Sequence, residues 1–99
     1  MRRTFSFTAK IWVYPGKVAW SFVSVPAETT TEIDFYFAHE KRGWGSLPVH
    51  ATLGQSTWDT SIFPDRKTKT YLLPIKAAIR TAEGVKEGDS ITIFLQISV

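Results

Sequence analysis

The chain has 99 residues, no cysteine and a net charge of +3, and 43% of its residues are hydrophobic. This composition excludes disulfides, thiolate metal sites and a cysteine nucleophile, and it supplies enough apolar material for one domain spanning residues 1–99. Because no apolar stretch approaches the roughly 20 residues that span a bilayer, we expect a soluble, cytoplasmic domain without a membrane partner. We also expect it to be a monomer or a weak dimer.

The N-terminal quarter predicts a β-hairpin. Apolar and polar residues alternate from Thr4 to Tyr14, which is typical of a half-buried strand. Its apolar face carries Phe5, Phe7, Ala9, Ile11 and Val13. Pro15-Gly16 is typical of a type II turn in which the glycine takes positive φ. Lys17 to Val25 then predicts the antiparallel partner. One face of that partner carries Val18, Trp20 and Phe22.

The next segment predicts a helix, with a strand as the alternative. Thr29-x-x-Glu32 matches a capping box, in which two side chains satisfy backbone groups at a helix start. Ile33 and Phe37 have helical spacing, but with Phe35 between them they also alternate as in a strand. The capping box favours a helix from about Thr30 to Lys41.

The middle of the chain predicts a second hairpin. Gly43-Trp44-Gly45-Ser46 is typical of a loop, and Pro48 to Leu53 predicts a short strand after it. Gly54 permits a tight turn into Gln55 to Phe63, whose Thr, Trp and Ile residues predict the antiparallel partner. Pro64 to Lys69 is a polar loop.

The last third predicts a strand, a helix and a strand. Thr70 to Leu73 is a short strand stopped by Pro74, a residue that a first helical turn tolerates. Gly84 ends the helix after it. The apolar stripe of this helix carries Ile75, Ala78, Ile79 and Ala82. Glu87-Gly88-Asp89 is a turn, and Ser90 to Ser98 is the final strand. Its apolar face carries Ile91, Ile93, Leu95 and Ile97.

Six predicted strands and two short helices indicate a mainly β fold. An open sheet would leave bare edges, and closure removes them. We therefore expect a small closed barrel whose helices cover its ends. Because the order strand, proline, helix, glycine, strand occurs in both halves, the pattern is also compatible with an internal duplication.

Several motifs resemble known families. The motifs are Trp20-x-Phe22-Val23-x-Val25-Pro26, Trp58-x-Thr60-Ser61-Ile62-x-Pro64, Tyr71-x-Leu73-Pro74-x-Lys76-x-x-x-Arg80 and Gly88-Asp89. The unit from Leu73 to Asp89 looks like the AbrB/MazE type of bacterial regulators and antitoxins, which are barrels that bind DNA as dimers. The whole chain more closely resembles an uncharacterised prokaryotic family, the domain-of-unknown-function family numbered nineteen-oh-five. That resemblance implies a double-split β-barrel within one chain, AbrB/MazE-like in shape, and no established activity.

Four residues are candidates for ligand binding: Lys76, Arg80, Ser61 and Trp44. Lys76 and Arg80 lie four positions apart, off the apolar stripe of the second predicted helix, where they could hold a phosphate or a carboxylate. The alternative is a solvated helix face, with Arg80 paired to Glu83. Ser61 follows Trp58-Asp59-Thr60 on a predicted strand, where it could equally satisfy backbone groups.

The four tryptophans divide into two pairs. Trp20 and Trp58 are expected in the core. Trp12 faces away from the apolar face of its strand, and Trp44 lies in a glycine-rich loop. An exposed pair of this kind would suggest a partner surface or a lid over a small ligand, and packing under the first helix is the alternative.

Catalytic and metal chemistry have little support in the sequence. His50, Asp59 and Ser61 could be combined into a nucleophilic triad, but the chain has no nucleophile-elbow motif. His39 and His50 are eleven positions apart without ligand-spaced partners. We assign no catalytic residue, no metal and no cofactor.

A basic cluster at Arg66, Lys67 and Lys69, with Arg2 and Arg3, is a candidate nucleic-acid surface if these charges converge on one face. A charged hairpin tip is the alternative. The sequence thus predicts a non-catalytic binding or interaction module for an unidentified small molecule or protein. A nucleic-acid-binding barrel is the second hypothesis, and an enzyme is the third.

Overall fold

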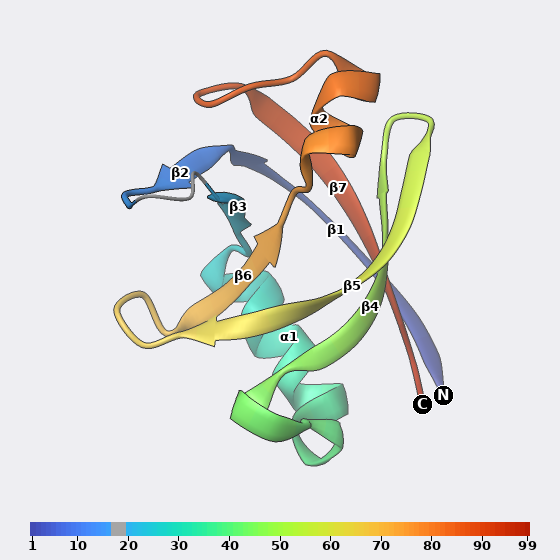
Figure 1. Cartoon of the computed structure of the whole chain (residues 1–99). Coiled ribbons are helices and arrows are strands. Elements are labelled where there is room, and N and C mark those ends of the chain that lie inside the picture. The colour runs from blue at the N-terminus through green and yellow to red at the C-terminus, as the bar shows by residue number, and fades with distance from the viewer. Residues whose placement is uncertain (17–19) are drawn as a thin grey trace.

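The computed structural model describes residues 1–16 and 20–99, and it is mainly β (Figure 1). Its strands are β1 (Arg2–Lys10), β2 (Trp12–Tyr14), β3 (Trp20–Ser24), β4 (Leu47–Leu53), β5 (Ser56–Asp65), β6 (Thr70–Pro74) and β7 (Ser90–Ser98). Its helices are α1 (Ala27–Phe37) and α2 (Ala77–Glu83), with single 3-10 turns at Ala38–Glu40 and Gly43–Gly45. The expected fold class, mainly β with two helices, is confirmed.

The strands form one sheet in the order β1-β7-β4-β5-β6-β3-β2, and every described ladder is antiparallel. The sheet curls into a half barrel with α1 beside its lower part in Figure 1. The two edge strands, β1 and β2, are separated in the chain only by Ile11. Two backbone hydrogen bonds fix this break: the Ile11 N–H donates to the Asp89 carbonyl oxygen at 3.0 Å, and the Gly88 N–H donates to the Ile11 carbonyl oxygen at 2.8 Å. The described sheet therefore has seven strands, because one expected strand is divided in two.

The N-terminal hairpin is shorter than expected. Only β2 pairs with β3, from Trp12 opposite Phe22 to Tyr14 opposite Trp20. The whole of β1 pairs instead with β7, because this register brings two apolar faces to the same side of the sheet. Gly16 has the expected positive φ, of 152°. Residues 17–19, which end the predicted turn and begin the predicted strand with Val18 on its face, lie outside the described residues.

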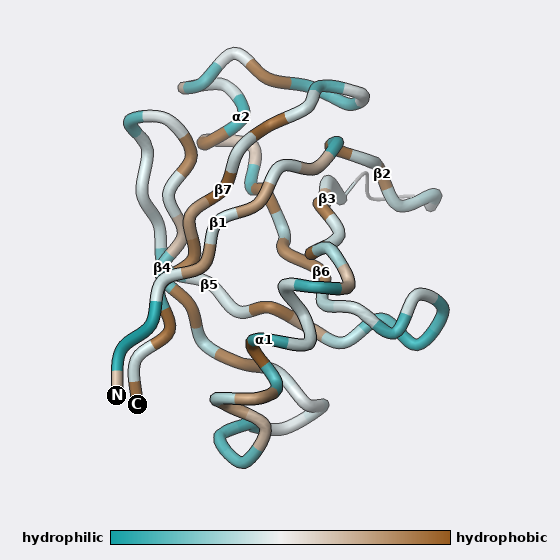
Figure 2. The backbone as a smooth tube through the Cα atoms, turned by 180° about the vertical axis from the view of Figure 1, so that it is seen from behind, coloured by the Kyte–Doolittle hydropathy of each residue, from teal (hydrophilic) through white to brown (hydrophobic). Residues whose placement is uncertain are grey.

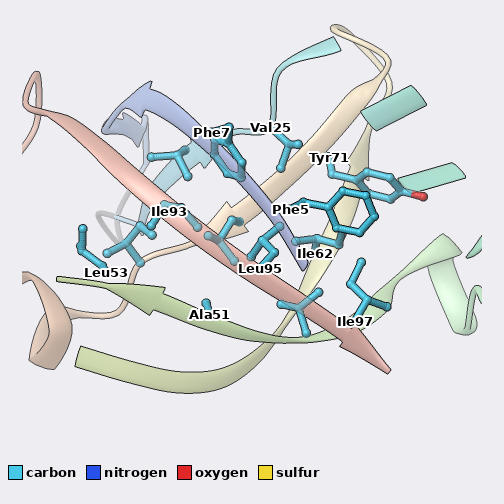
Figure 3. Packing of buried hydrophobic residues seen from close by; sticks show 14 of the residues in the cluster. Phe5, Phe7, Val25, Ala51, Leu53, Ile62, Tyr71, Ile93, Leu95 and Ile97 are labelled. Carbon is cyan, nitrogen blue, oxygen red and sulfur yellow. The ribbon is translucent and has the colours of Figure 1, made fainter. Parts of the chain in front are cut away.

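The apolar faces of the first and last strands turn to a shared interior, as expected. Phe5 and Phe7 of β1 are buried, and so are all four apolar residues predicted on the inner face of β7. Figure 3 shows these side chains meeting those of β4, β5 and β6 in one cluster. Figure 2 shows a long hydrophobic run along β7, whereas the β5–β6 turn is hydrophilic. Burial of each large apolar side chain stabilises the fold by about 1.5–3 kcal/mol.

The inner face of β3 is the opposite of the predicted one. Ser21, Val23 and Val25 are buried, whereas Trp20 is 56% exposed. An alternating pattern shows that a strand has two faces, but it does not show which of them meets the core. Trp58 of β5 is buried, as expected.

Helix α1 forms in the segment where a strand was the alternative, but the predicted boundaries are wrong. It begins at Ala27 and ends at Phe37, about three residues before the expected span. The predicted capping box is absent, because the helix begins before Thr29, and Pro26 occupies the N-cap position without a side-chain cap hydrogen bond. Inside the helix, the hydroxyl of Thr30 contacts the Val25 carbonyl oxygen at 3.5 Å and accepts a hydrogen bond from the Tyr71 backbone N–H at 3.4 Å. This threonine therefore connects α1 to β6.

Helix α2 is shorter than predicted. It begins at Ala77, after Lys76, so only Ile79 of the predicted stripe is both helical and buried; Ala78 and Ala82 are exposed. Gly84 ends the helix in the left-handed region, as expected. The remaining predicted strands differ from β4, β5, β6 and β7 by two residues or fewer at each end. None of the helices in residues 1–16 and 20–99 is long and apolar enough to cross a membrane.

The carboxylate of Glu83 anchors α2 to the β4–β5 turn. It accepts a hydrogen bond of 2.5 Å from the Ser56 hydroxyl, and a Cβ at Gly54 would lie 2.0 Å from its Oε1 atom. Gly54 also has a φ of 59°. We expect Gly54→Ala to lower the free energy of unfolding by about 2–3 kcal/mol in urea denaturation, because it adds backbone strain and displaces Glu83.

The Glu83→Ala background is the control for this substitution. In that background the added methyl group meets no carboxylate. Gly54→Ala should then lower the free energy of unfolding only through backbone strain at Gly54, by about 1–2 kcal/mol. An equal cost in both backgrounds would show that Glu83 does not occupy the space beside Gly54.

Candidate functional site

A hollow of about 270 Å³ lies between β3 and the start of α2. The β3–β6 ladder ends with Phe22 opposite Pro74, and the Ile75 backbone N–H then donates to the Ser21 carbonyl oxygen at 2.9 Å. This bond holds the segment before α2 against β3. Lys76 and Arg80 thereby line the same hollow as the exposed indole of Trp20.

The two cations of this hollow are available to a ligand. The Arg80 Nε–H donates to the Ile75 carbonyl oxygen at 3.2 Å, a bond that orients the guanidinium and does not use its terminal nitrogens. The alternative pairing with Glu83 is not formed, since that carboxylate bonds to Ser56. Within the described part of the chain, neither Lys76 nor Arg80 forms a salt bridge.

Next to this hollow, four aromatic side chains cover one face of β2 and β3. This aromatic strip consists of Trp12, Tyr14, Trp20 and Phe22. Neighbouring ring centroids are 5.3–6.5 Å apart, and the rings of Trp20 and Phe22 are nearly parallel, at 23°. The Trp12 Nε1–H donates to the Ser24 hydroxyl at 3.1 Å, which fixes that indole.

The strip borders two further hollows. One, of about 380 Å³, is lined by Tyr14, Pro15, Gly16, Trp20 and Phe22. The other, of about 240 Å³, is lined by Trp12, Tyr14, Pro15, Asp65, Lys67 and Leu72. The first two hollows share Trp20 and the last two share Tyr14, so the three lie next to one another; this row of hollows, called the groove below, has Lys76 and Arg80 at one end and Lys67 at the other.

The family described as a domain of unknown function (DUF1905) matches residues 7–95, which is most of the chain. The chain belongs to this family. No curated protein matches the sequence. Every residue that lines the groove lies inside the span matched to DUF1905, and the family description assigns no activity to it.

The other two candidate ligand-binding residues lie away from the groove in this DUF1905 chain. Ser61 is on β5, opposite Pro48 of β4. Trp44 lies in the 3-10 turn after α1 and is 94% exposed. The structure thus brings together two of the four candidates, Lys76 and Arg80, and adds the aromatic strip to them.

The basic residues of the β5–β6 turn do not converge on one face. Lys67 lies at the end of the aromatic strip, whereas Arg66 and Lys69 line a separate hollow of about 210 Å³ beside Tyr71. The N-terminal arginines are on the other side of the molecule from this turn in Figures 1 and 2, and the Arg3 guanidinium lies 3.6 Å from the centre of the Tyr36 ring. The five candidate basic residues therefore do not line one common hollow, and nucleic-acid binding by this cluster stays a prediction.

Tyr71 is a structural residue in that separate hollow. Its ring lies in the core cluster, with the hydroxyl at the edge toward α1 (Figure 3), and the hydroxyl donates to an Asp34 carboxylate oxygen at 2.5 Å. Burial raises the pKa of Tyr71, and the hydrogen bond and negative charge of Asp34 raise it further. Its hydroxyl therefore stays protonated as a hydrogen-bond donor and does not serve as a general base.

Stability at alkaline pH is expected to depend on Tyr71. Unfolded tyrosine releases its proton near pH 10, while the folded residue keeps it, so the folded state binds more protons and the free energy of unfolding falls above pH 10. Tyr71→Phe should lose about 1 kcal/mol at neutral pH and show less alkaline loss in urea denaturation. Parallel stability profiles for the wild type and Tyr71→Phe from pH 8 to 11 would contradict this assignment.

The structure does not assemble a catalytic triad from His50, Asp59 and Ser61. His50 Nδ1 and Asp59 Oδ1 are 2.8 Å apart across the β4–β5 ladder, and both residues are exposed enough to be solvated. Among the described side chains, no hydrogen bond joins Ser61 to this pair. His39 lies in the turn after α1. The described residues contain no group of three side chains that could hold a metal ion.

Proposed function

We propose that this DUF1905 protein is a non-catalytic binding module that takes a flat, anionic ligand in the hollow between Trp20, Lys76 and Arg80. The observation that carries the proposal is the placement of two cations without carboxylate partners beside a half-exposed indole, in the described part of the chain. The indole offers a surface for stacking, and the ammonium and guanidinium groups can bind a phosphate or a carboxylate.

The size of the hollow supports a small ligand or one ring of a larger one. At about 270 Å³, it is just below the usual range for sites that enclose a drug-sized molecule. Its lining combines apolar side chains with a few charged groups, which is typical of ligand sites. A cytoplasmic location and a monomeric or weakly dimeric state stay predictions.

Adenosine monophosphate is a suitable probe, because it joins a flat ring to a phosphate. We expect it to bind the intact chain in a calorimetric titration, with adenosine and inorganic phosphate binding more weakly. Trp20→Ala and Arg80→Ala should each weaken binding at least tenfold, since one removes the stacking surface and the other an oriented cation.

Trp44→Ala is the matched control, because it removes an exposed indole outside the groove. It should leave the affinity for adenosine monophosphate unchanged, and all variants should keep the cooperative unfolding of the parent. The proposal fails if adenosine monophosphate does not bind, or if Trp44→Ala weakens binding as much as Trp20→Ala does.

A further inference from the structure

We infer that the full groove binds single-stranded nucleic acid, with bases stacked on the aromatic strip and phosphates near Lys67 at one end and Lys76 and Arg80 at the other. This inference rests on the proposed function, because the Trp20 hollow is one end of the same groove. It extends that function from one flat anion to a strand that follows the groove from α2 to the β5–β6 turn.

Continuity of the groove is the first argument. The middle hollow shares Trp20 with the first and Tyr14 with the third, so an extended ligand on this surface would meet the three hollows in succession. The register of the hairpin, with Trp12 opposite Phe22 and Tyr14 opposite Trp20, holds the four rings on one face. A ligand of one ring would use only part of this surface.

The exposure of the rings is the second argument. Tyr14 and Trp20 are 55% and 56% exposed, and Trp12 and Phe22 are half-buried. Exposed neighbouring rings provide a platform on which bases of any sequence can stack, because every base has a π-face. In a duplex these faces are covered by adjacent base pairs, so the strip favours a single strand.

Charge is the third argument, and it distinguishes a polyanion from other ligands of aromatic grooves. Proline-rich peptides also bind such grooves, but they do not require cations at both ends. Here Lys67 and the pair Lys76 and Arg80 flank the strip. The nearby carboxylate of Asp65 is engaged with the Lys67 backbone N–H and the Thr68 hydroxyl, at 3.0 and 3.1 Å, which reduces its repulsion of a phosphate.

The test is fluorescence anisotropy with a labelled single strand of about eight thymidylates, a length within the range that small single-strand-binding domains cover. The intact chain should bind this strand more tightly than it binds adenosine monophosphate. If three phosphates are neutralised, raising the salt from about 50 to 200 mM should weaken binding about 20-fold. A duplex of the same length should bind more weakly than the single strand.

Variants at the far end of the groove separate this inference from the proposed function. Lys67→Ala and Trp12→Phe should weaken binding of the strand, by about tenfold for Lys67→Ala, and leave the affinity for adenosine monophosphate unchanged. Lys86→Ala, which removes an exposed lysine outside the groove, is the control for charge and should have little effect. Trp12→Phe keeps an aromatic ring against Phe22, so its folding can be verified independently.

The two binding assays together distinguish failure of the inference from failure of the proposed function. If adenosine monophosphate binds as expected but Lys67→Ala does not weaken binding of the strand, the inference falls and the proposed function stands. If Lys67→Ala weakens strand binding while adenosine monophosphate does not bind at all, the proposed function falls, and the strand binds at the Lys67 end alone, which overturns the inference for the full groove. Tighter binding of a proline-rich peptide than of the strand, or an affinity for the strand that does not change with salt, would overturn the inference.

Discussion

Replacing Phe37 by alanine is expected to lower the free energy of unfolding by about 3–5 kcal/mol. Phe37 ends α1, has no exposed surface and packs edge to face against Phe5 of β1, with ring centroids 6.4 Å apart. Alanine would remove this contact and leave a cavity between the helix and the sheet. Equilibrium urea denaturation measures the loss, with an unchanged m-value indicating that only stability has changed.

Phe35→Ala is the matched control for this prediction. Phe35 lies two residues earlier on the same helix but is 80% exposed. Its replacement removes few core contacts, so the change should stay within about 0.5 kcal/mol. If Phe35→Ala were as costly as Phe37→Ala, both side chains would face the core, as residues two apart do on one face of a strand, and the helical assignment of this segment would fall.

Leu95→Ala is expected to cost about 2–5 kcal/mol, the usual range for truncating a buried leucine. Leu95 is fully buried in β7, between Phe5 of β1 and Ala51 of β4 in the ladder. The small side chain of Ala51 cannot fill the space that the leucine would leave. Chemical denaturation of this variant therefore tests whether β1, β4 and β7 enclose one interior.

The neighbouring residue provides the comparison. Phe94 is 47% exposed on the other face of β7, so Phe94→Ala should cost clearly less than Leu95→Ala although it removes a larger side chain. A reversed order of the two costs would mean that the strand presents its other face to the core, and the position of every outward residue on β7 would change with it.

The sequence predicted most elements because their signals are local. Alternation identified the final strand, and proline and glycine marked the limits of the segments around α2. The errors arose where a distant contact competed with a local signal. Helix α1 begins at Ala27, so Thr29 lies inside it and does not cap it, and the hydroxyl of Thr30 contacts the Tyr71 backbone, 41 residues away. On β3, Ser21 faces inward although Trp20 is far more apolar.

The candidate site was predictable only in part, for the same reason. The spacing of Lys76 and Arg80 predicted two cations on one side of a helix, and they do lie close together although Lys76 comes just before α2. Their partner Trp20 comes from β3, and only the β3–β6 pairing and the Ile75–Ser21 hydrogen bond bring it near them. Sequence alternation put Trp12 and Tyr14 on a common face, but it could not show that β3 adds Trp20 to the same side. The register between β2 and β3 determines that placement.

The pairing of β1 with β7 has a consequence for the order in which the chain folds. Of the strands described here, β1 is synthesised before the others and its ladder partner β7 after them, and the register runs from Arg2 opposite Ser98 to Lys10 opposite Ser90. Closing so long a loop is entropically costly and slow, whereas the β4–β5 hairpin forms between adjacent segments. A nascent chain that ends before β7 therefore carries Phe5 and Phe7 on a strand without its ladder partner, a state in which chaperones or other chains can bind it.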